Sequence, residues 1–167
     1  LEKIKHSSNI SSKLKTYLLN NNFYTFNSSS ELFINDSKDG KLIKSIKIEQ
    51  KDNNDQLIST LLKNNFFILG YNSGIIIKIN LEGKIIWEYQ KNKIFNSSIH
   101  ELNNMIFLLY GNEIVALNFD DGKLLWSEIY DDKPIIQSSG GQLFNFFNDI
   151  YFYLPNSRLG AIDTLLG

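Results

Sequence analysis

Residues with catalytic potential are few in this chain. It has no cysteine and only two histidines, His6 and His100, so thiolate chemistry, disulfides and a multi-histidine metal site are excluded. His100 lies in an apolar stretch, where a half-buried strand residue is expected rather than a general base. A serine nucleophile would be expected on a Gly-x-Ser-x-Gly turn, and that sequence is absent. The sequence therefore predicts no catalytic residue, no bound cofactor and no metal ligand in this segment.

Three polar stretches have residue types that bind ions in other settings. The Ser138–Gly141 stretch could hold an anion through its backbone N–H groups, but no helix and no P-loop lysine follow it. Asp52–Asp55 and the Asp131-Asp132 pair offer the oxygen ligands that Ca²⁺ uses, without the spacing and glycine of a calcium loop. We interpret the first as a connection between repeats and the other two as solvated turns.

Charge and hydropathy exclude further classes of function. The 167 residues carry 17 basic and 18 acidic side chains, a formal net charge of −1, and Arg158 is the single arginine. Such a balance gives no attraction for nucleic acid or for an anionic membrane. No apolar run approaches the roughly 20 residues that cross a bilayer as a helix. The abundance of Ile, Lys and Asn is interpreted as the imprint of an AT-rich genome and not as a physical requirement.

The elements that would position any functional residue follow from a repeat. An apolar strand, a polar turn, a second strand, an acidic-Gly-Lys turn and a third strand recur at intervals of roughly 40 residues, as in propeller blades. No helical periodicity is present, and β-branched and aromatic residues are enriched. The turn needs a residue at positive φ, which glycine supplies. The repeated glycines are Gly40, Gly83, Gly122 and Gly167.

A fourth strand is expected just ahead of the first one in each repeat. The candidates are Leu14–Leu19, Ile58–Leu62, Ser97–Leu102 and Gln142–Phe146, each ending in an Asn-containing turn that can close a hairpin. The sequence thus predicts an all-β fold of about four four-stranded blades, part of a seven- or eight-bladed propeller. We expect a single domain over residues 1–167, with blades at 10–50, 56–91, 97–130 and 140–167, the last one truncated.

The repeats resemble those of pyrroloquinoline-quinone (PQQ)-type propellers. The third repeat has Val115-Ala-Leu-Asn118 followed by Gly122-Lys-Leu-Leu-Trp126, and the second has Gly83-Lys-Ile-Ile-Trp87. The fourth repeat has Gly160-Ala-Ile-Asp163, whereas the first departs with Lys44 at the tryptophan position. The resemblance implies that each tryptophan locks adjacent blades through aromatic packing and an indole N–H hydrogen bond.

This resemblance implies two alternative functions for the segment, and the sequence leaves a third open. The catalytic branch of this family carries a vicinal cysteine pair, Ca²⁺ and an Asp base around the quinone, whereas this chain has no cysteine. Its non-catalytic branch is similar to BamB, a lipoprotein of outer-membrane β-barrel assembly. The similarity to BamB implies a non-enzymatic scaffold that binds protein partners on the periplasmic side of the envelope. It is also compatible with a lipid anchor upstream of the segment. The alternatives are a PQQ dehydrogenase whose site lies outside this segment, and a eukaryotic luminal propeller that binds unfolded chains and carries glycans at Asn27 or Asn96.

A partner surface is expected on the two proline-marked connections, because propellers bind through their loops. The candidate partner-binding residues are Asp131, Asp132, Pro134, Pro155 and Arg158. An incomplete ring would also leave unpacked faces at its two ends. We therefore expect the isolated 167 residues to be marginally soluble or to self-associate.

Overall fold

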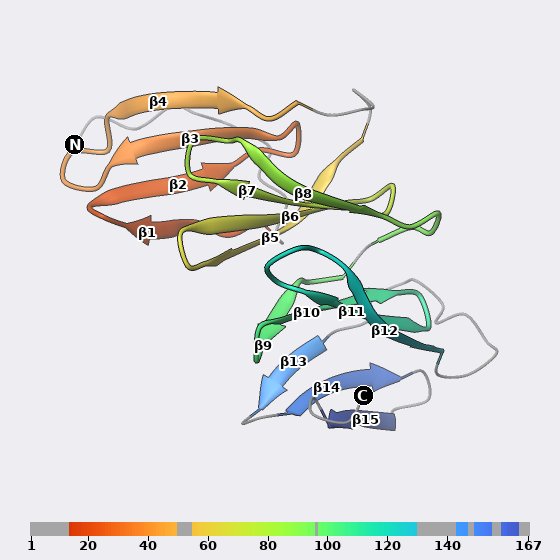
Figure 1. Ribbon diagram of the computed structural model, residues 1–167. Helices are drawn as coiled ribbons and strands as arrows, with labels where there is room; N and C mark the ends of the chain where they lie inside the picture. The colour runs from red at the N-terminus through yellow and green to blue at the C-terminus, as the bar shows by residue number, and fades with distance from the viewer. Residues whose placement is uncertain are drawn as a thin grey trace.

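The computed structural model describes residues 14–49, 55–95, 97–129, 143–146, 149–154 and 158–163. These residues form fifteen β-strands and no helix. The strands make four antiparallel sheets that follow one another along the chain and lie face to face (Figure 1). The predicted all-β fold is confirmed.

Each sheet is built from strands that are consecutive in the sequence. The first sheet has β1 (Tyr17–Leu19), β2 (Asn22–Phe26), β3 (Glu31–Asp36) and β4 (Leu42–Lys47). The second has β5 (Leu57–Lys63), β6 (Phe66–Tyr71), β7 (Ile75–Asn80) and β8 (Ile85–Gln90). The third has β9 (His100–Leu102), β10 (Met105–Tyr110), β11 (Glu113–Asn118) and β12 (Leu124–Ile129). The fourth contains β13 (Leu143–Phe146), β14 (Asp149–Leu154) and β15 (Arg158–Asp163).

Pairs of asparagines make the first turn in three of the sheets. Asn20-Asn21, Asn64-Asn65 and Asn103-Asn104 all have φ between 49° and 63°. Two successive left-handed residues form the hairpin turn whose twist matches that of the flanking strands, and asparagine tolerates this conformation well. These six asparagines thus meet a physical requirement of the backbone, and the Asn-containing turns expected from the sequence are confirmed in these three sheets.

The acidic-Gly-Lys turns join the third strand of a sheet to the fourth. Gly40, Gly83 and Gly122 have φ of 73°, 83° and 71°. Gly167 lies outside the described residues, so its place in such a turn stays a prediction. The division of the chain into the predicted blade ranges also stays a prediction.

A β-bulge follows each of these turns. In the first sheet Asn35 pairs with Leu42 and Ile34 with Lys44, so Ile43 has no partner residue on β3. The same shift leaves Ile86 without a pairing partner on β7 and Leu125 without one on β11. An extra residue of this kind bends the strand and redirects its side chain.

The hydrophobic core is divided into three clusters, one between each pair of adjacent sheets. We call these interfaces the first, second and third seams in chain order. Strand β6 contributes to two of them: Phe67 and Leu69 enter the first seam, and Ile68 enters the second. A middle strand that is buried on both faces needs apolar residues at every position, which explains its unbroken apolar sequence.

Candidate binding surfaces

In the second seam, one backbone carbonyl group accepts two hydrogen bonds from the neighbouring sheet. The Trp87 indole Nε1 donates to the Phe119 oxygen over 3.1 Å, and the Lys78 ammonium donates to the same oxygen over 3.0 Å. Trp87 also lies on Gly122, where an added Cβ would come within 2.6 Å of the indole ring. Trp87 is 8% exposed. It therefore closes the seam and has no face left to stack on a ligand.

Lys78 is almost completely buried in this seam, at 3% exposed. Its ammonium lies 3.9 Å from the centre of the Phe119 ring and 4.4 Å from that of Phe66. Burial lowers the pKa of Lys78 below 10.5, and the charge of Asp120 partly opposes this. The aromatic faces and the carbonyl compensate for the water that the ammonium loses.

Three charged side chains close the opposite edge of the second seam. Glu113, at the start of β11, accepts hydrogen bonds from Lys91 at 2.6 Å and Lys93 at 2.5 Å. Both lysines come from the segment directly after β8. Burial acts to raise the pKa of the Glu113 carboxyl, but the bonds from the two lysines outweigh it and hold that pKa below 4.5. Beside them, the Tyr110 hydroxyl donates to the Gly74 carbonyl over 3.1 Å.

The first seam has no tryptophan. Lys44, at the equivalent position, is exposed, and Ile46 packs on Gly83 as Trp87 packs on Gly122. Aromatic packing stabilises the rest of this seam, since Tyr17, Tyr24 and Phe26 surround Phe67 at ring-centre distances of 5.6, 5.7 and 5.0 Å. Burial raises the pKa of the Tyr17 phenol to about 12, although a hydrogen bond with Thr60 opposes this.

In the third seam Trp126 is half-buried and packs edge-on to Phe107, with 6.0 Å between the ring centres. It contacts the cluster that also contains Leu143 and Ile150 of the fourth sheet. Gly160 of β15 lies opposite Phe152 of β14, and a Cβ at Gly160 would come within 2.2 Å of the Phe152 ring. A glycine is therefore required at this position for the aromatic ring to lie across the strand.

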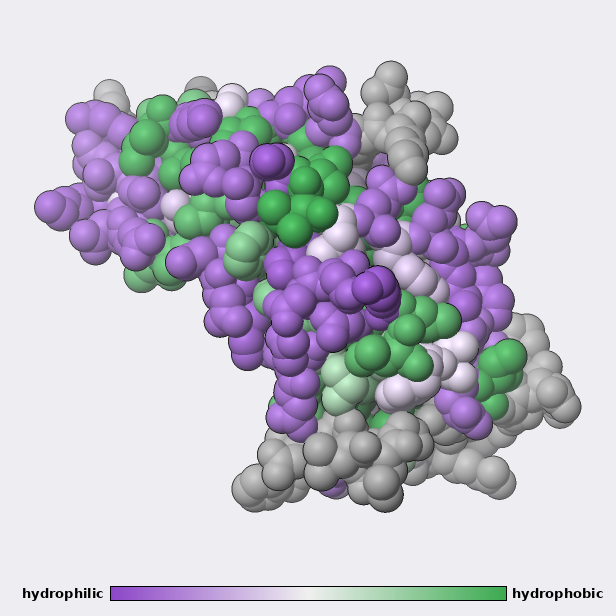
Figure 2. Space-filling view, in the orientation of Figure 1, coloured by the Kyte–Doolittle hydropathy of each residue, from purple (hydrophilic) through white to green (hydrophobic). Residues whose placement is uncertain are grey.

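Exposed aliphatic residues recur at the start of each outer strand. We call this set the outer rim: Leu42, Ile43, Ile85, Ile86, Leu124 and Leu125, each between 38% and 57% exposed. The bulged members are Ile43, Ile86 and Leu125, one per sheet. Figure 2 shows apolar patches among hydrophilic residues over the region where β8 and β12 lie. Strands β4, β8 and β12 are edge strands of their sheets among the described residues.

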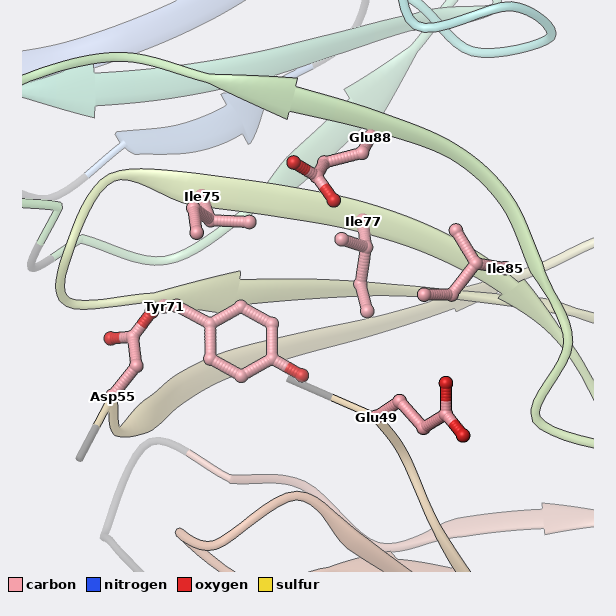
Figure 3. A pocket seen from close by; sticks show the side chains of 7 residues that line it. All are labelled: Glu49, Asp55, Tyr71, Ile75, Ile77, Ile85 and Glu88. Carbon is pink, nitrogen blue, oxygen red and sulfur yellow. The ribbon is translucent and has the colours of Figure 1, made fainter. Parts of the chain in front are cut away.

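A cavity of about 220 Å³ opens beside the first seam. Its apolar wall consists of Ile75, Ile77 and Ile85, from β7 and β8. The polar wall is formed by the carboxyl groups of Glu49, Asp55 and Glu88 together with Tyr71, and none of the lining residues that the structure describes is a lysine or an arginine. Figure 3 shows Tyr71 and the isoleucines lying between Asp55 on one side and Glu49 on the other. Two hydrogen bonds from Ser73 hold the Asp55 carboxylate in place.

Several residues singled out from the sequence lie outside the described part of the chain. These are His6, Asp52, Asn96, Asp131, Asp132, Pro134, Ser138–Gly141, Pro155 and Gly167. Arg158 is the first residue of β15, and the structure describes only its backbone. His100 lies in β9, half-buried and opposite Phe107. The side chain of Asn27 accepts hydrogen bonds from the N–H groups of Ser29 and Glu31, so it stabilises its own turn.

Other features described above were missed at the sequence level. The recurring Gly-Lys-aliphatic-aliphatic sequence was a signal for the outer rim, but its exposure depends on the bulges. Lys78 and Glu113 gave no signal, because each interacts with residues of a neighbouring repeat or connection. Within the described ranges, no three His, Cys, Asp or Glu side chains are arranged to hold a metal ion. No helix of these ranges is long and apolar enough to cross a membrane.

Comparison of the fold with solved structures decides the architecture. BamB from Moraxella catarrhalis superposes with a TM-score of 0.65 at 17% identity, over 88% of this chain and 44% of that one. The computationally designed Ika4 protein gives a TM-score of 0.72 at 12% identity, over 95% and 92% of the two chains. The chain has the fold of a β-propeller segment. Quinohemoprotein alcohol dehydrogenase from Comamonas testosteroni matches at 14% identity and a TM-score of 0.55, over 69% of this chain and 20% of that one.

The resemblance to PQQ-type propellers, and to BamB among them, is thus confirmed at the level of structure. By sequence alone, no protein family and no curated protein matches this propeller segment. The chain spans less than half of the length of BamB and a fifth of the length of the dehydrogenase. At these identities the likeness establishes the fold and leaves the activity open.

Proposed function

We propose that the segment is a non-catalytic scaffold that binds protein partners. The observation that carries this proposal is the outer rim, because it repeats a bulged, exposed aliphatic residue in three successive sheets. Apolar side chains that gather on a hydrophilic surface characterise protein interaction sites. The bulges also disturb the free backbone edge, so a partner would contact side chains here rather than add a strand.

The resemblance to BamB supplies the setting of the proposal. We infer a place on the periplasmic side of the cell envelope and a partner from the outer-membrane β-barrel assembly machinery. The fold supports a role in protein interaction, while the compartment and the partner are taken from the resemblance alone.

A PQQ dehydrogenase is the second candidate, favoured by the likeness to the alcohol dehydrogenase. Its quinone and Ca²⁺ require converging carboxylates, which the described residues do not provide. The chain also lacks the vicinal cysteines. Within the described ranges the residues do not fit this group, so its site would have to lie elsewhere in the protein.

The experiment is purification of the full-length protein from its native membranes in mild detergent. We expect a β-barrel assembly protein to co-purify, with no quinone absorbance. With the triple variant Ile43→Ser, Ile86→Ser, Leu125→Ser, the amount of partner that co-purifies should fall at least tenfold. Central apolar contacts dominate interface energies, at about 2 kcal/mol each. Ile94→Ser is the matched control, because Ile94 is 60% exposed and lies off the rim. Recovery of the protein alone with bound quinone or Ca²⁺ would overturn the scaffold proposal.

A further inference from the structure

The outer rim consists of three equivalent copies of one surface. In each of the first three sheets, an acidic-Gly-Lys turn is followed by two exposed aliphatic residues, and the second of these is bulged. The lysines of two turns are paired within the turn, since Lys41 lies 2.9 Å from Asp39 and Lys123 lies 2.7 Å from Asp121. The repeated surface is therefore complementary to apolar side chains of a partner.

The spacing of the three copies is set by contacts beside the rim. Ile46 of β4 packs on Gly83, which lies just before the rim residues of the second sheet. Trp87 of β8 packs in the same way on Gly122, just before the rim residues of the third sheet. The sheets are thus in contact at the rim as well as in the core. Because sheets that pack face to face lie about 10 Å apart, the copies of the rim should recur at about that distance.

An α-helix matches this spacing better than an extended chain does. Seven helical residues rise about 10.5 Å, and they end only about 20° away from a whole number of turns. Three side chains that are seven residues apart therefore lie on one face of a helix. In an extended chain, the side chains of one face recur about every 6.6 Å. One helix of about fifteen residues or more would thus reach all three copies of the rim.

The charge of the edge strands changes from one end of the rim to the other. Strand β4 carries two exposed lysines, Lys44 and Lys47, and no acidic residue. Strand β12 carries the exposed Glu128 and no basic residue. A helix has a partial negative charge at its C-terminus and a partial positive charge at its N-terminus. A helix across the rim is therefore favoured when its C-terminus lies over β4 and its N-terminus over β12.

We propose that the outer rim binds an amphipathic helix of a partner protein, which carries aliphatic side chains at every seventh position and has its C-terminus over β4. One of these side chains contacts each bulged residue, Ile43, Ile86 and Leu125. This inference rests on the proposed scaffold function and specifies the part of the partner that the scaffold binds.

The test is titration of the whole chain with a capped helical peptide of alanine and glutamine that carries three leucines at heptad spacing. NMR of the isoleucine methyl groups should show saturable shifts of the Ile43, Ile85 and Ile86 signals. A peptide of the same composition with its leucines five residues apart distributes them around the helix and should bind at least tenfold more weakly. A heptad peptide with proline in its middle turn should also bind at least tenfold more weakly, because proline breaks the helix.

Variants of the rim connect the peptide with the bulged residues. The triple variant Ile43→Ser, Ile86→Ser, Leu125→Ser should bind the heptad peptide at least tenfold more weakly. Ile94→Ser is the matched control, because it removes an exposed isoleucine that lies off the rim, and its affinity should equal that of the wild type.

The orientation of the helix has its own measurement. The double variant Lys44→Gln, Lys47→Gln should bind the peptide about twofold to fivefold more weakly at low salt, because the helix dipole contributes about that much. Lys15→Gln, an exposed lysine ahead of β1, should leave the affinity unchanged. A nitroxide on the C-terminus of the peptide should broaden the methyl signals of Ile43, and a nitroxide on its N-terminus should broaden those of Leu125.

Two kinds of result would overturn the inference. One is binding of the proline peptide, or of the peptide with leucines five residues apart, as tight as that of the heptad peptide. The other is the reverse broadening pattern, with the N-terminal nitroxide acting on Ile43. If no peptide shifts the rim signals while the native partner still depends on the rim for co-purification, the helix is wrong and the scaffold proposal stands. If the triple variant retains the native partner in full, the rim is not the binding surface and both proposals fail.

Discussion

Glu113 of the third sheet forms ion pairs with two lysines of the segment that follows the second sheet. Its side chain is 7% exposed, and its carboxylate accepts hydrogen bonds from two lysines whose side chains are 20% and 45% exposed. A carboxylate buried to this degree is stable only when it is paired, and here the pairing bridges two sheets. The ion group therefore stabilises the seam and not merely the surface.

Replacing this carboxylate is expected to weaken the fold in a pH-dependent way. Glu113→Gln should lower the free energy of unfolding at pH 7 by about 2 kcal/mol, since hydrogen bonds to charged groups contribute about 1.5–3 kcal/mol. Because the pKa of Glu113 is held below 4.5 in the folded protein, its contribution is present above that pH and is lost as the pH falls through the lowered pKa. Urea unfolding at pH 7 and at lower pH should show the wild type losing its advantage over the variant in acid. Glu82→Gln, an exposed control, should change the stability by less than about 0.5 kcal/mol, and an equal loss in both variants would contradict the role of the ion group.

At the residue scale the sequence indicated the turn residues better than the buried charges. An Asn-Asn pair between two apolar runs has a local cause, the left-handed turn, and can be recognised without knowing what lies nearby. Lys78 and Glu113 appear in apolar strands as ordinary polar residues. Their partners belong to another sheet or to a connection, about 20 to 40 positions away, and only the folded structure brings them together.

Among the elements, the acidic-Gly-Lys turns have two roles. They reverse the chain at positive φ, and they provide the flat surface on which the preceding sheet packs. Gly122 meets Trp87, and Gly83 meets Ile46. A side chain at either glycine would therefore strain the backbone and also collide with the neighbouring sheet.

These two costs can be separated with a matched pair of glycines. Gly122→Ala should destabilise the protein by about 3 kcal/mol or more, because an L-residue in the left-handed region costs about 1–2 kcal/mol and the indole ring must also move. Gly111 has a similar φ of 65°, yet a Cβ there would meet no atom within 4 Å. Gly111→Ala should therefore cost only the backbone term, about 1–2 kcal/mol. Chemical denaturation of both variants measures the difference, and equal losses would show that the contact with Trp87 is unimportant.

The outer strands show where sequence reasoning stops at the scale of elements. The repeat predicted a strand after each acidic-Gly-Lys turn, and β4, β8 and β12 are those strands. The bulge within each of these strands could not be predicted. Two consecutive aliphatic residues after Gly-Lys look the same in the sequence whether or not the strand contains an extra residue. Exposure of Ile43, Ile86 and Leu125 follows from that single shift in register.

At the scale of the whole chain, the described sheets form a row whose first and last faces differ from each other. On the first sheet, Leu18 is 63% exposed on the face that it shares with Phe23, away from the first seam. On the fourth, Phe144 is 42% exposed and stacks on Tyr151, with 5.6 Å between the ring centres. Each seam joins two unlike faces, so contacts between such ends are head-to-tail and do not need to close after two copies.

We expect the 167-residue chain to self-associate with increasing concentration through these faces. The double variant Leu18→Lys, Phe144→Lys should reduce the association, since each removes apolar burial of about 1.5–3 kcal/mol from a contact. Ile94→Lys is the control, because Ile94 is 60% exposed but belongs to neither face. Sedimentation velocity over a range of concentrations provides the measurement. A well-folded monomer at every concentration would contradict this expectation.

The number of sheets and their order could be predicted from the repeat, because each sheet is formed by neighbouring strands of the sequence. The cavity beside the first seam could not. Its lining residues come from the segment after β4 and from the second sheet, and only the folded structure brings them together.

The two tryptophans give this protein a built-in optical signal. Trp87 is enclosed in the second seam with its N–H bonded to a carbonyl, whereas Trp126 is only partly covered in the third. Their fluorescence therefore differs in wavelength and in access to quenchers dissolved in the solvent. In a Trp126→Phe chain all of the tryptophan emission comes from the second seam, and a red shift reports the separation of the second and third sheets.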